Sequence, residues 1–133
     1  MARLTAFAPQ FLVDDLERSL AFYRALGFDF GQPWDGFYAI GTRDGLELHL
    51  KQAPRAEAEA KRAYQAAYET LDAAAGVDGI EDFHALCVER RVNIVRPLTA
   101  TDWGTMDFYV RDPDGNLIAF GGVPAARAAS VET

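Results

Sequence analysis

The sequence has a single cysteine, no long run of apolar residues, and fewer basic than acidic side chains. With Cys87 the only cysteine among its 133 residues, the chain can form no internal disulfide, and a reducing compartment is expected. No segment approaches the roughly 20 apolar residues of a membrane-spanning helix, and the first residues lack the apolar core of a signal peptide. These absences predict a cytoplasmic protein with no membrane partner.

The shortage of basic residues argues against a second class of partner. Lys and Arg total 13, whereas Asp and Glu total 20, for a formal net charge of −7. Binding to nucleic acid requires a basic surface that neutralises phosphates, so we expect no nucleic-acid partner. A negative field would instead attract a cationic small molecule, or it would simply keep the protein soluble.

The sequence contains enough hydrophobic residues to form the core of one folded domain with helices and strands. Hydrophobic residues make up 50% of the chain and charged residues 25%. Asp14 is the expected N-cap of a first helix, Glu17 would complete a capping box, and Gly27 would follow the helix. Asp44-Gly45 is typical of a two-residue hairpin turn. Strands are expected at residues 5–13, 28–30, 37–42 and 46–50.

The second half of the chain repeats the first. At a shift of 64 residues, Val13-Asp14-x-Leu16-Glu17 falls on Val77-Asp78-x-Ile80-Glu81. At a shift of 70 residues, Asp44-Gly45 falls on Asp114-Gly115. Neither unit can bury its sheet face alone, so the units must pair, either within one chain or between two chains.

The repeat predicts an α+β fold made of two paired βαβββ modules. Module one would span about residues 4–51 and module two about residues 70–123, which requires a weak strand near residues 70–77. Residues 52–69 are rich in Ala, Glu, Lys and Arg, and they are expected to form a surface helix or a mobile connector.

Two motifs resemble those of a known superfamily. The first is D-L-x-R-S-x-x-F-Y at residues 15–23, and the second is W-G…F…R-D-P-D-G-N at residues 103–116. Both are similar to motifs of the glyoxalase, bleomycin-resistance and extradiol-dioxygenase proteins, the vicinal-oxygen-chelate superfamily. Outside residues 52–69 the chain resembles the bleomycin-resistance branch. The resemblance implies the vicinal-oxygen-chelate fold and a homodimer, in which modules pair across chains and each groove is built from both subunits.

The resemblance also bears on metal binding. Superfamily enzymes hold one divalent metal through equivalent positions of the two modules, and these positions fall on Ala8, His49, Asp72 and Ala119. Alanine cannot ligate a metal, and catalytic sites usually have at least three protein ligands. The resemblance therefore implies no metal and no other cofactor. Glu47 shares a strand face with His49, so a His49, Glu47 and Asp72 site is one alternative, and a His49 that is only hydrogen-bonded is another.

The function implied by the resemblance is sequestration of an antibiotic. The ligand would be a flat, cationic, aromatic-bearing molecule, bleomycin-like, bound without bond cleavage. Trp103 is the first candidate to stack on it, although an aromatic residue at the start of a strand can also belong to the core. Two alternatives stay open, a metal-dependent lyase, dioxygenase or thiol transferase with an atypical ligand set, and a module that binds another small metabolite. The candidate ligand-binding residues are Trp103, Phe37, Tyr38, Phe108 and Trp34 for stacking, Glu47, Asp72 and Asp102 for charge, and His49.

Overall fold

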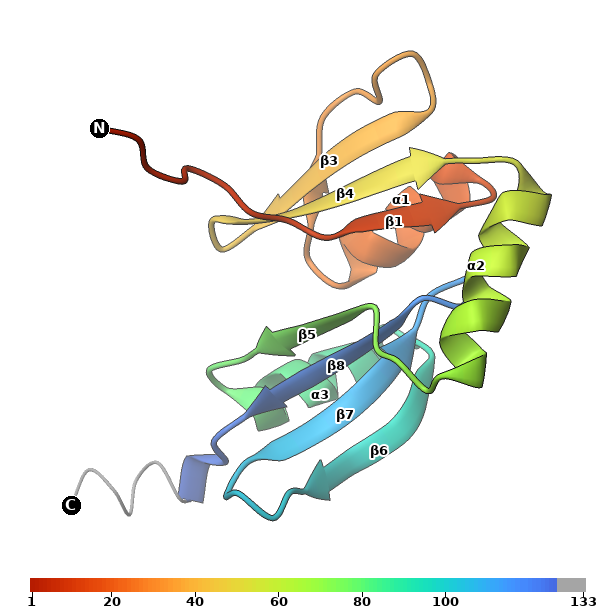
Figure 1. The fold of residues 1–133 in the computed structure, drawn as a ribbon. Helices are drawn as coiled ribbons and strands as arrows, with labels where there is room; N and C mark the ends of the chain where they lie inside the picture. The colour runs from red at the N-terminus through yellow and green to blue at the C-terminus, as the bar shows by residue number, and fades with distance from the viewer. Residues whose placement is uncertain (127–133) are drawn as a thin grey trace. The chain divides into compact units, whose positions relative to one another are not determined.

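The structure, a computed structural model, describes residues 1–126. The chain divides into two compact units, module one ending at Thr70 and module two beginning at Leu71. Module one contains β1 (Gln10–Val13), α1 (Leu16–Ala25), β2 (Asp29–Phe30), β3 (Tyr38–Arg43), β4 (Leu46–Gln52) and α2 (Arg55–Ala67) (Figure 1). Module two contains β5 (Ala73–Gly76), α3 (Ile80–Glu89), β6 (Ile94–Ala100), β7 (Met106–Arg111) and β8 (Leu117–Gly122).

Each module contains a βαβββ unit around a mixed four-stranded sheet, and in module one α2 follows this unit. The strand order is β1-β4-β3-β2 in module one and β5-β8-β7-β6 in module two. In both sheets the first strand runs parallel to the last strand of its module, and the other neighbours are antiparallel. The predicted α+β fold with two βαβββ modules is confirmed.

The register of the two sheets reproduces the sequence repeat at the level of single residues. Gln10 of β1 lies opposite His49 of β4 in module one. Ala74 of β5 lies opposite Ala119 of β8 in module two. The two pairs are related by the shifts of 64 and 70 residues found in the sequence. The first and last strands of the two modules therefore correspond in register.

The core of module one lies between α1 and one face of its sheet. α1 presents Leu16, Leu20 and Tyr23 at helical spacing, and each of these side chains is at most 2% exposed. The Tyr23 ring packs on Phe11 of β1, with ring centroids 6.1 Å apart. Full burial of one such side chain contributes about 1.5–3 kcal/mol, so this layer stabilises the module. The buried strand residues are Phe11, Val13, Ala39, Leu48 and Leu50.

Module two repeats this arrangement with a more aromatic core. Phe83 of α3 contacts Phe108 of β7 and Phe120 of β8, with ring centroids 6.0 and 4.9 Å apart. Cys87, also on α3, is fully buried. Because side chains alternate along a strand, the residues next to Phe108 and Phe120 point to the opposite face of the sheet. That face, which α3 does not cover, is called the open face below.

Turn chemistry explains how the strands of each module are joined. Asp44 and Gly45, between β3 and β4, have φ values of 53° and 78°, the left-handed conformation that a tight hairpin needs and that Gly and Asp tolerate. In module two, Oδ1 of Asp112 accepts hydrogen bonds from the backbone N–H groups of Asp114 and Asn116, at 2.9 and 2.8 Å. The predicted turns at both positions are confirmed.

The N-cap of the first helix differs from the prediction by one residue. Asp15, not Asp14, caps α1, because its backbone is extended and its carboxylate accepts a hydrogen bond from the N–H of Arg18. The Asp14 carboxylate lies instead 3.5 Å from the Arg62 guanidinium of α2. This ion pair ties α2 to the end of β1.

Other segments also have different limits from those predicted. The first strand begins at Gln10 rather than at residue 5, because Pro9 has no N–H to donate to a sheet. The weak strand near residues 70–77 is reduced to Ala73–Gly76. Residues Arg55–Ala67 form a helix, in which Ala58 is 1% exposed. Within residues 1–126, no helix combines the length and the apolar character needed to cross a membrane.

Candidate functional site

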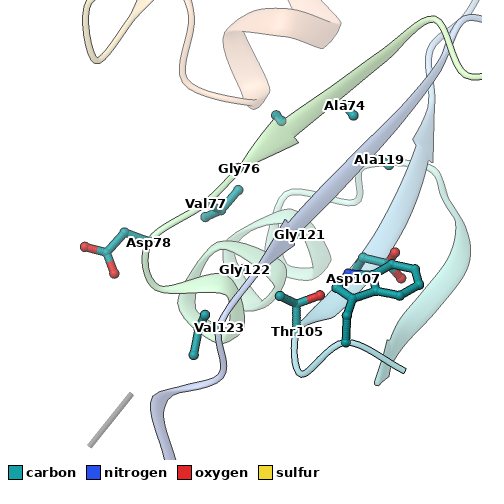
Figure 2. A pocket seen from close by; sticks show the side chains of 12 residues that line it. Ala74, Gly76, Val77, Asp78, Thr105, Asp107, Ala119, Gly121, Gly122 and Val123 are labelled. Atoms are coloured by element: carbon teal, nitrogen blue, oxygen red, sulfur yellow. The ribbon is translucent and has the colours of Figure 1, made fainter. Parts of the chain in front are cut away.

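A hollow of about 580 Å³ lies on the open face of module two. Its floor is made by Ala74 and Gly76 of β5 and by Ala119 and Gly121 of β8, which lie side by side in Figure 2. These four residues carry a methyl group or no side chain; Ala74 and Gly76 are exposed, Gly121 is half-buried and Ala119 is 9% exposed. A floor of this kind leaves room for a flat group to lie against the backbone.

The exposed indole of Trp103 stands at the hollow. Trp103 is 74% exposed, although large aromatic side chains are normally well covered. It lies in the turn between β6 and β7, which is held by hydrogen bonds between Thr101 and Thr105 of 2.8 and 3.1 Å. A side chain on a braced turn is well placed to stack on a ligand. The alternative that Trp103 is a core residue is not supported by its exposure.

A carboxylate adjoins the floor of the hollow. Asp107 of β7 lies opposite Gly121 in the sheet, and a methyl group at Gly121 would come within 3.3 Å of the Asp107 Cβ. Oδ1 of Asp107 is buried, lies 3.6 Å from the Arg96 guanidinium, and has no hydrogen-bond partner among the described residues. A buried acceptor without a hydrogen bond costs about 1–3 kcal/mol. The Asp107 side chain as a whole is 15% exposed, so part of it is accessible beside the floor.

Asp107 was not among the residues predicted from the sequence. Its signal was nevertheless present, because Phe108 and Val110 are core residues, and alternation places Asp107 and Tyr109 on the opposite face. The guanidinium of Arg96 lies 4.7 Å from the centroid of the Tyr109 ring, so a cation already stacks on this face.

Three of the residues predicted for the ligand site lie elsewhere in module two. Phe108 is 0% exposed and belongs to the aromatic core, because β7 turns it toward α3. Oδ2 of Asp72 accepts a hydrogen bond from the backbone N–H of Leu117 at 2.7 Å, so this carboxylate joins β5 to β8. Asp102 is exposed beside Trp103 and does not line the hollow.

In module one, three of the predicted residues form a hydrogen-bonded cluster. The Tyr38 hydroxyl lies 2.7 Å from Nδ1 of His49, and Nε2 of His49 lies 3.2 Å from Oε1 of Glu47. Gln10, which sequence reasoning missed, donates a hydrogen bond of 2.9 Å to the Tyr38 hydroxyl. These four residues, called the module-one network below, lie on the face of the sheet opposite α1. Only the register between β1 and β4 identifies Gln10.

The other predicted aromatic residues of module one surround the start of β3. Trp34 is 72% exposed and Phe37 is 38% exposed. Trp34 forms an isolated β-bridge with Tyr38, and the Phe37 ring packs edge-on against Tyr38 with centroids 6.2 Å apart. These contacts place both residues near Tyr38.

The residues present do not fit a divalent metal of the kind that the resemblance associates with enzymes. His49 uses both ring nitrogens in hydrogen bonds, and its neighbour on β1 is Gln10 rather than Ala8. The counterparts in module two, Ala74 and Ala119, have no ligating atom. Among residues 1–126, no three His, Cys, Asp or Glu side chains gather into a group that could hold a metal ion.

The fold and the hollow together define a class of protein. It is a small α+β protein of two βαβββ modules with a ligand-sized hollow on an open sheet face. Residues 4–120 match the family model described as Glyoxalase/Bleomycin resistance protein/Dioxygenase superfamily. The chain belongs to this superfamily. None of the curated proteins compared with the chain matches it significantly.

Solved structures share the fold at low sequence identity. A bleomycin-binding protein complexed with bleomycin is 20% identical, with a TM-score of 0.70 over 91% of this chain and 100% of that chain. A bleomycin resistance determinant encoded on the transposon Tn5 is 20% identical, with a TM-score of 0.71 over 90% and 98%. A glyoxalase/bleomycin resistance protein/dioxygenase from Alicyclobacillus acidocaldarius is 15% identical, with a TM-score of 0.70 over 92% and 94%. At these identities the likeness establishes the fold.

Proposed function

We propose that this chain is a binding protein that sequesters a flat, cationic, aromatic-bearing molecule, bleomycin-like, without breaking a bond in it. The observation that carries the proposal is the module-two hollow, in which an indole that is 74% exposed adjoins a floor of Ala and Gly. The ligand ring stacks on Trp103 and covers the floor. Its positive charge lies toward Asp107.

The interactions available at the hollow favour a ligand of this class. A stacked aromatic pair adds roughly 0.5–1.5 kcal/mol beyond its buried area, and a cation held over an indole adds a similar amount. The Asp107 carboxylate lines the hollow, with 15% of its side chain exposed, and its negative charge attracts the cation. The net charge of −7 draws a cation toward the protein.

The comparisons support the same class of ligand. The structures of a bleomycin-binding protein complexed with bleomycin and of a bleomycin resistance determinant share the fold over at least 90% of this chain. The ligand named for those proteins is the reason to choose a bleomycin-class drug as the first probe here. We also expect the chain to act as a homodimer, as the resemblance implies.

The experiment is a calorimetric titration of the purified protein with a bleomycin-class drug, followed by mass spectrometry of the drug recovered from the complex. The proposal expects saturable binding and recovery of the drug with its mass unchanged. Recovery of a modified drug would show that the protein is an enzyme. Absence of binding, together with binding of a neutral metabolite in a parallel screen, would overturn the proposed ligand class.

A further inference from the structure

Asp107 has neighbours on two sides of its strand in module two. On one side it lines the hollow, and it lies opposite Gly121 of β8. On the other side its Oδ1 atom lies 3.6 Å from the guanidinium of Arg96, which belongs to β6, the strand at the edge of the sheet. The same carboxylate therefore adjoins both the floor proposed for the ligand and a positive charge of the protein itself.

The charge of Arg96 lies over an aromatic ring. Tyr109 of β7 is the sheet partner of Arg96, and the guanidinium carbon of Arg96 lies 4.7 Å from the centroid of the Tyr109 ring. A cation at such a distance is attracted by the face of the ring. Tyr109 and Asp107 alternate with the buried Phe108, so both side chains point to the open face and form a place for a planar cation. Arg96 fills that place in the structure.

The contacts that hold Arg96 in this place are weak. The separation of 3.6 Å exceeds the length of a hydrogen bond, and Oδ1 of Asp107 has no hydrogen-bond partner among the described residues. The Arg96 side chain is 38% exposed, and ion pairs with this exposure contribute little to stability. Arg96 can therefore move into solvent at a small cost in free energy.

The backbone around Arg96 is irregular. The pairing of β6 with β7 shifts its register between Ile94 and Arg96, and it shifts again between Arg96 and Thr99. Pro97, the next residue, has no N–H to donate to a ladder. Irregularities of this kind are frequent in edge strands and beside active sites, where they change the direction of a side chain. Because the ladder is interrupted on both sides of Arg96, this residue can move without breaking the rest of the sheet.

We propose that Arg96 is a specificity-determining residue of the hollow, a tethered cation that the positive group of the ligand displaces. This inference rests on the proposed function. The ligand ring lies on the Ala and Gly floor, and a planar guanidinium or amidinium attached to it replaces Arg96 over Tyr109 and beside Asp107. Neighbouring strands lie about 4.8 Å apart, so one small ligand spans the distance from the floor to Tyr109. A neutral group cannot displace Arg96, because neither the ring face nor the carboxylate attracts it as strongly as a cation.

Phenylguanidinium and phenylurea are matched probes for this displacement. Each has a benzene ring with a planar substituent of the same size, which is positive in the first and neutral in the second. The experiment is a titration of isotope-labelled protein by NMR, with the wild type and with Arg96→Gln, which removes the charge and keeps part of the aliphatic stem. Arg96→Gln should bind phenylguanidinium about tenfold more tightly than the wild type does, because the competing cation is gone, and phenylurea with unchanged affinity.

Two further variants isolate the charge and the carboxylate. Arg55→Ala, at an exposed ion pair on α2, makes the net charge more negative by the same amount and should leave both affinities unchanged. Asp107→Asn, added to Arg96→Gln, should abolish the gain for phenylguanidinium. A measurement on the wild type requires no variant. The nuclear Overhauser effects between the Arg96 side chain and the Tyr109 ring should disappear when phenylguanidinium is bound.

Several results would overturn the inference. Arg96→Gln that binds neither probe, or binds both as the wild type does or both more weakly, would leave Arg96 only the role of fastening β6 to β7. Persistence of the contacts between Arg96 and Tyr109 with phenylguanidinium bound would exclude displacement. Shifts at Tyr38 and His49 of the module-one network in place of Tyr109 would put the probe on the other module.

The proposed function and this inference fail separately. A protein that does not bind a bleomycin-class drug, but in which phenylguanidinium displaces Arg96, would support the inference and contradict the proposed drug class. A protein that binds the drug with the same affinity before and after Arg96→Gln would support the proposed function and contradict the inference.

Discussion

Oδ2 of Asp72 accepts a hydrogen bond from the backbone N–H of Leu117 at 2.7 Å, and this contact joins the start of β5 to the start of β8. Asp72→Ala removes the acceptor and should lower the free energy of unfolding by about 1–3 kcal/mol. Drug binding at the hollow should persist, because Asp72 does not line it. A denaturant melt and a titration measure the two effects, with Asp72→Asn as the control that keeps an acceptor oxygen. If Asp72→Ala lost drug binding but kept its stability, Asp72 would be a ligand-binding residue.

Gly76 offers a way to fill the hollow without disturbing the fold. A Cβ at Gly76 meets no atom within 4 Å, and its φ lies outside the left-handed region. Gly76→Val should therefore leave stability unchanged or raise it by about 0.5–1 kcal/mol, while its side chain occupies the floor and abolishes drug binding. Gly31→Val is the matched control, because Gly31 in module one is equally uncrowded. If Gly76→Val binds the drug as well as the wild type, the ligand does not lie on this floor.

The protein should hold no stoichiometric transition metal after purification without chelators. Ala74 and Ala119 cannot ligate, and His49 already uses both nitrogens. Elemental analysis of the purified protein measures the metal content. One tightly held metal per chain, lost in His49→Ala, would contradict the binding-protein interpretation and favour a metal-dependent enzyme.

The protein should be a dimer in solution. The repeat of two modules that each leave one sheet face open requires pairing, and the resemblance implies pairing across chains. Sedimentation equilibrium should give about twice the chain mass of 14.6 kDa. A single species at the chain mass in the micromolar range would favour pairing of the modules within one chain.

The fold could be predicted from the sequence because its signals are local and occur twice. Asp44-Gly45 and Asp114-Gly115 both mark turns, and Val13-Asp14-x-Leu16-Glu17 recurs as Val77-Asp78-x-Ile80-Glu81 around the start of each helix. The exact ends of the helices and strands could not be predicted, because they depend on contacts between residues distant in the sequence. Asp14 failed as a cap because Arg62 of α2 attracts its carboxylate.

The candidate site could be predicted only in part, because a strand residue can contact a ligand only if its side chain points to the open face of the sheet. Trp103 was chosen from its motif and is 74% exposed, and its ligand-stacking role stays a prediction. Phe108 was chosen as an aromatic residue, but its place in the alternation of β7 buries it. The position of Gln10 beside His49 results from the parallel pairing of β1 with β4, and no local sequence pattern predicts that pairing.

The central claim is that a flat cationic drug stacks on Trp103 at the module-two hollow. Its most direct test is a calorimetric titration of the wild type and of Trp103→Ala with a bleomycin-class drug, paired with a denaturant melt of both proteins. The variant should bind about tenfold more weakly, since stacking and cation attraction together contribute about 1–3 kcal/mol and 1.4 kcal/mol is a factor of ten. It should unfold at nearly the same denaturant concentration, because the indole is 74% exposed. Unchanged binding with a loss of about 3–5 kcal/mol in stability, the cost of truncating a core Trp, would contradict the claim.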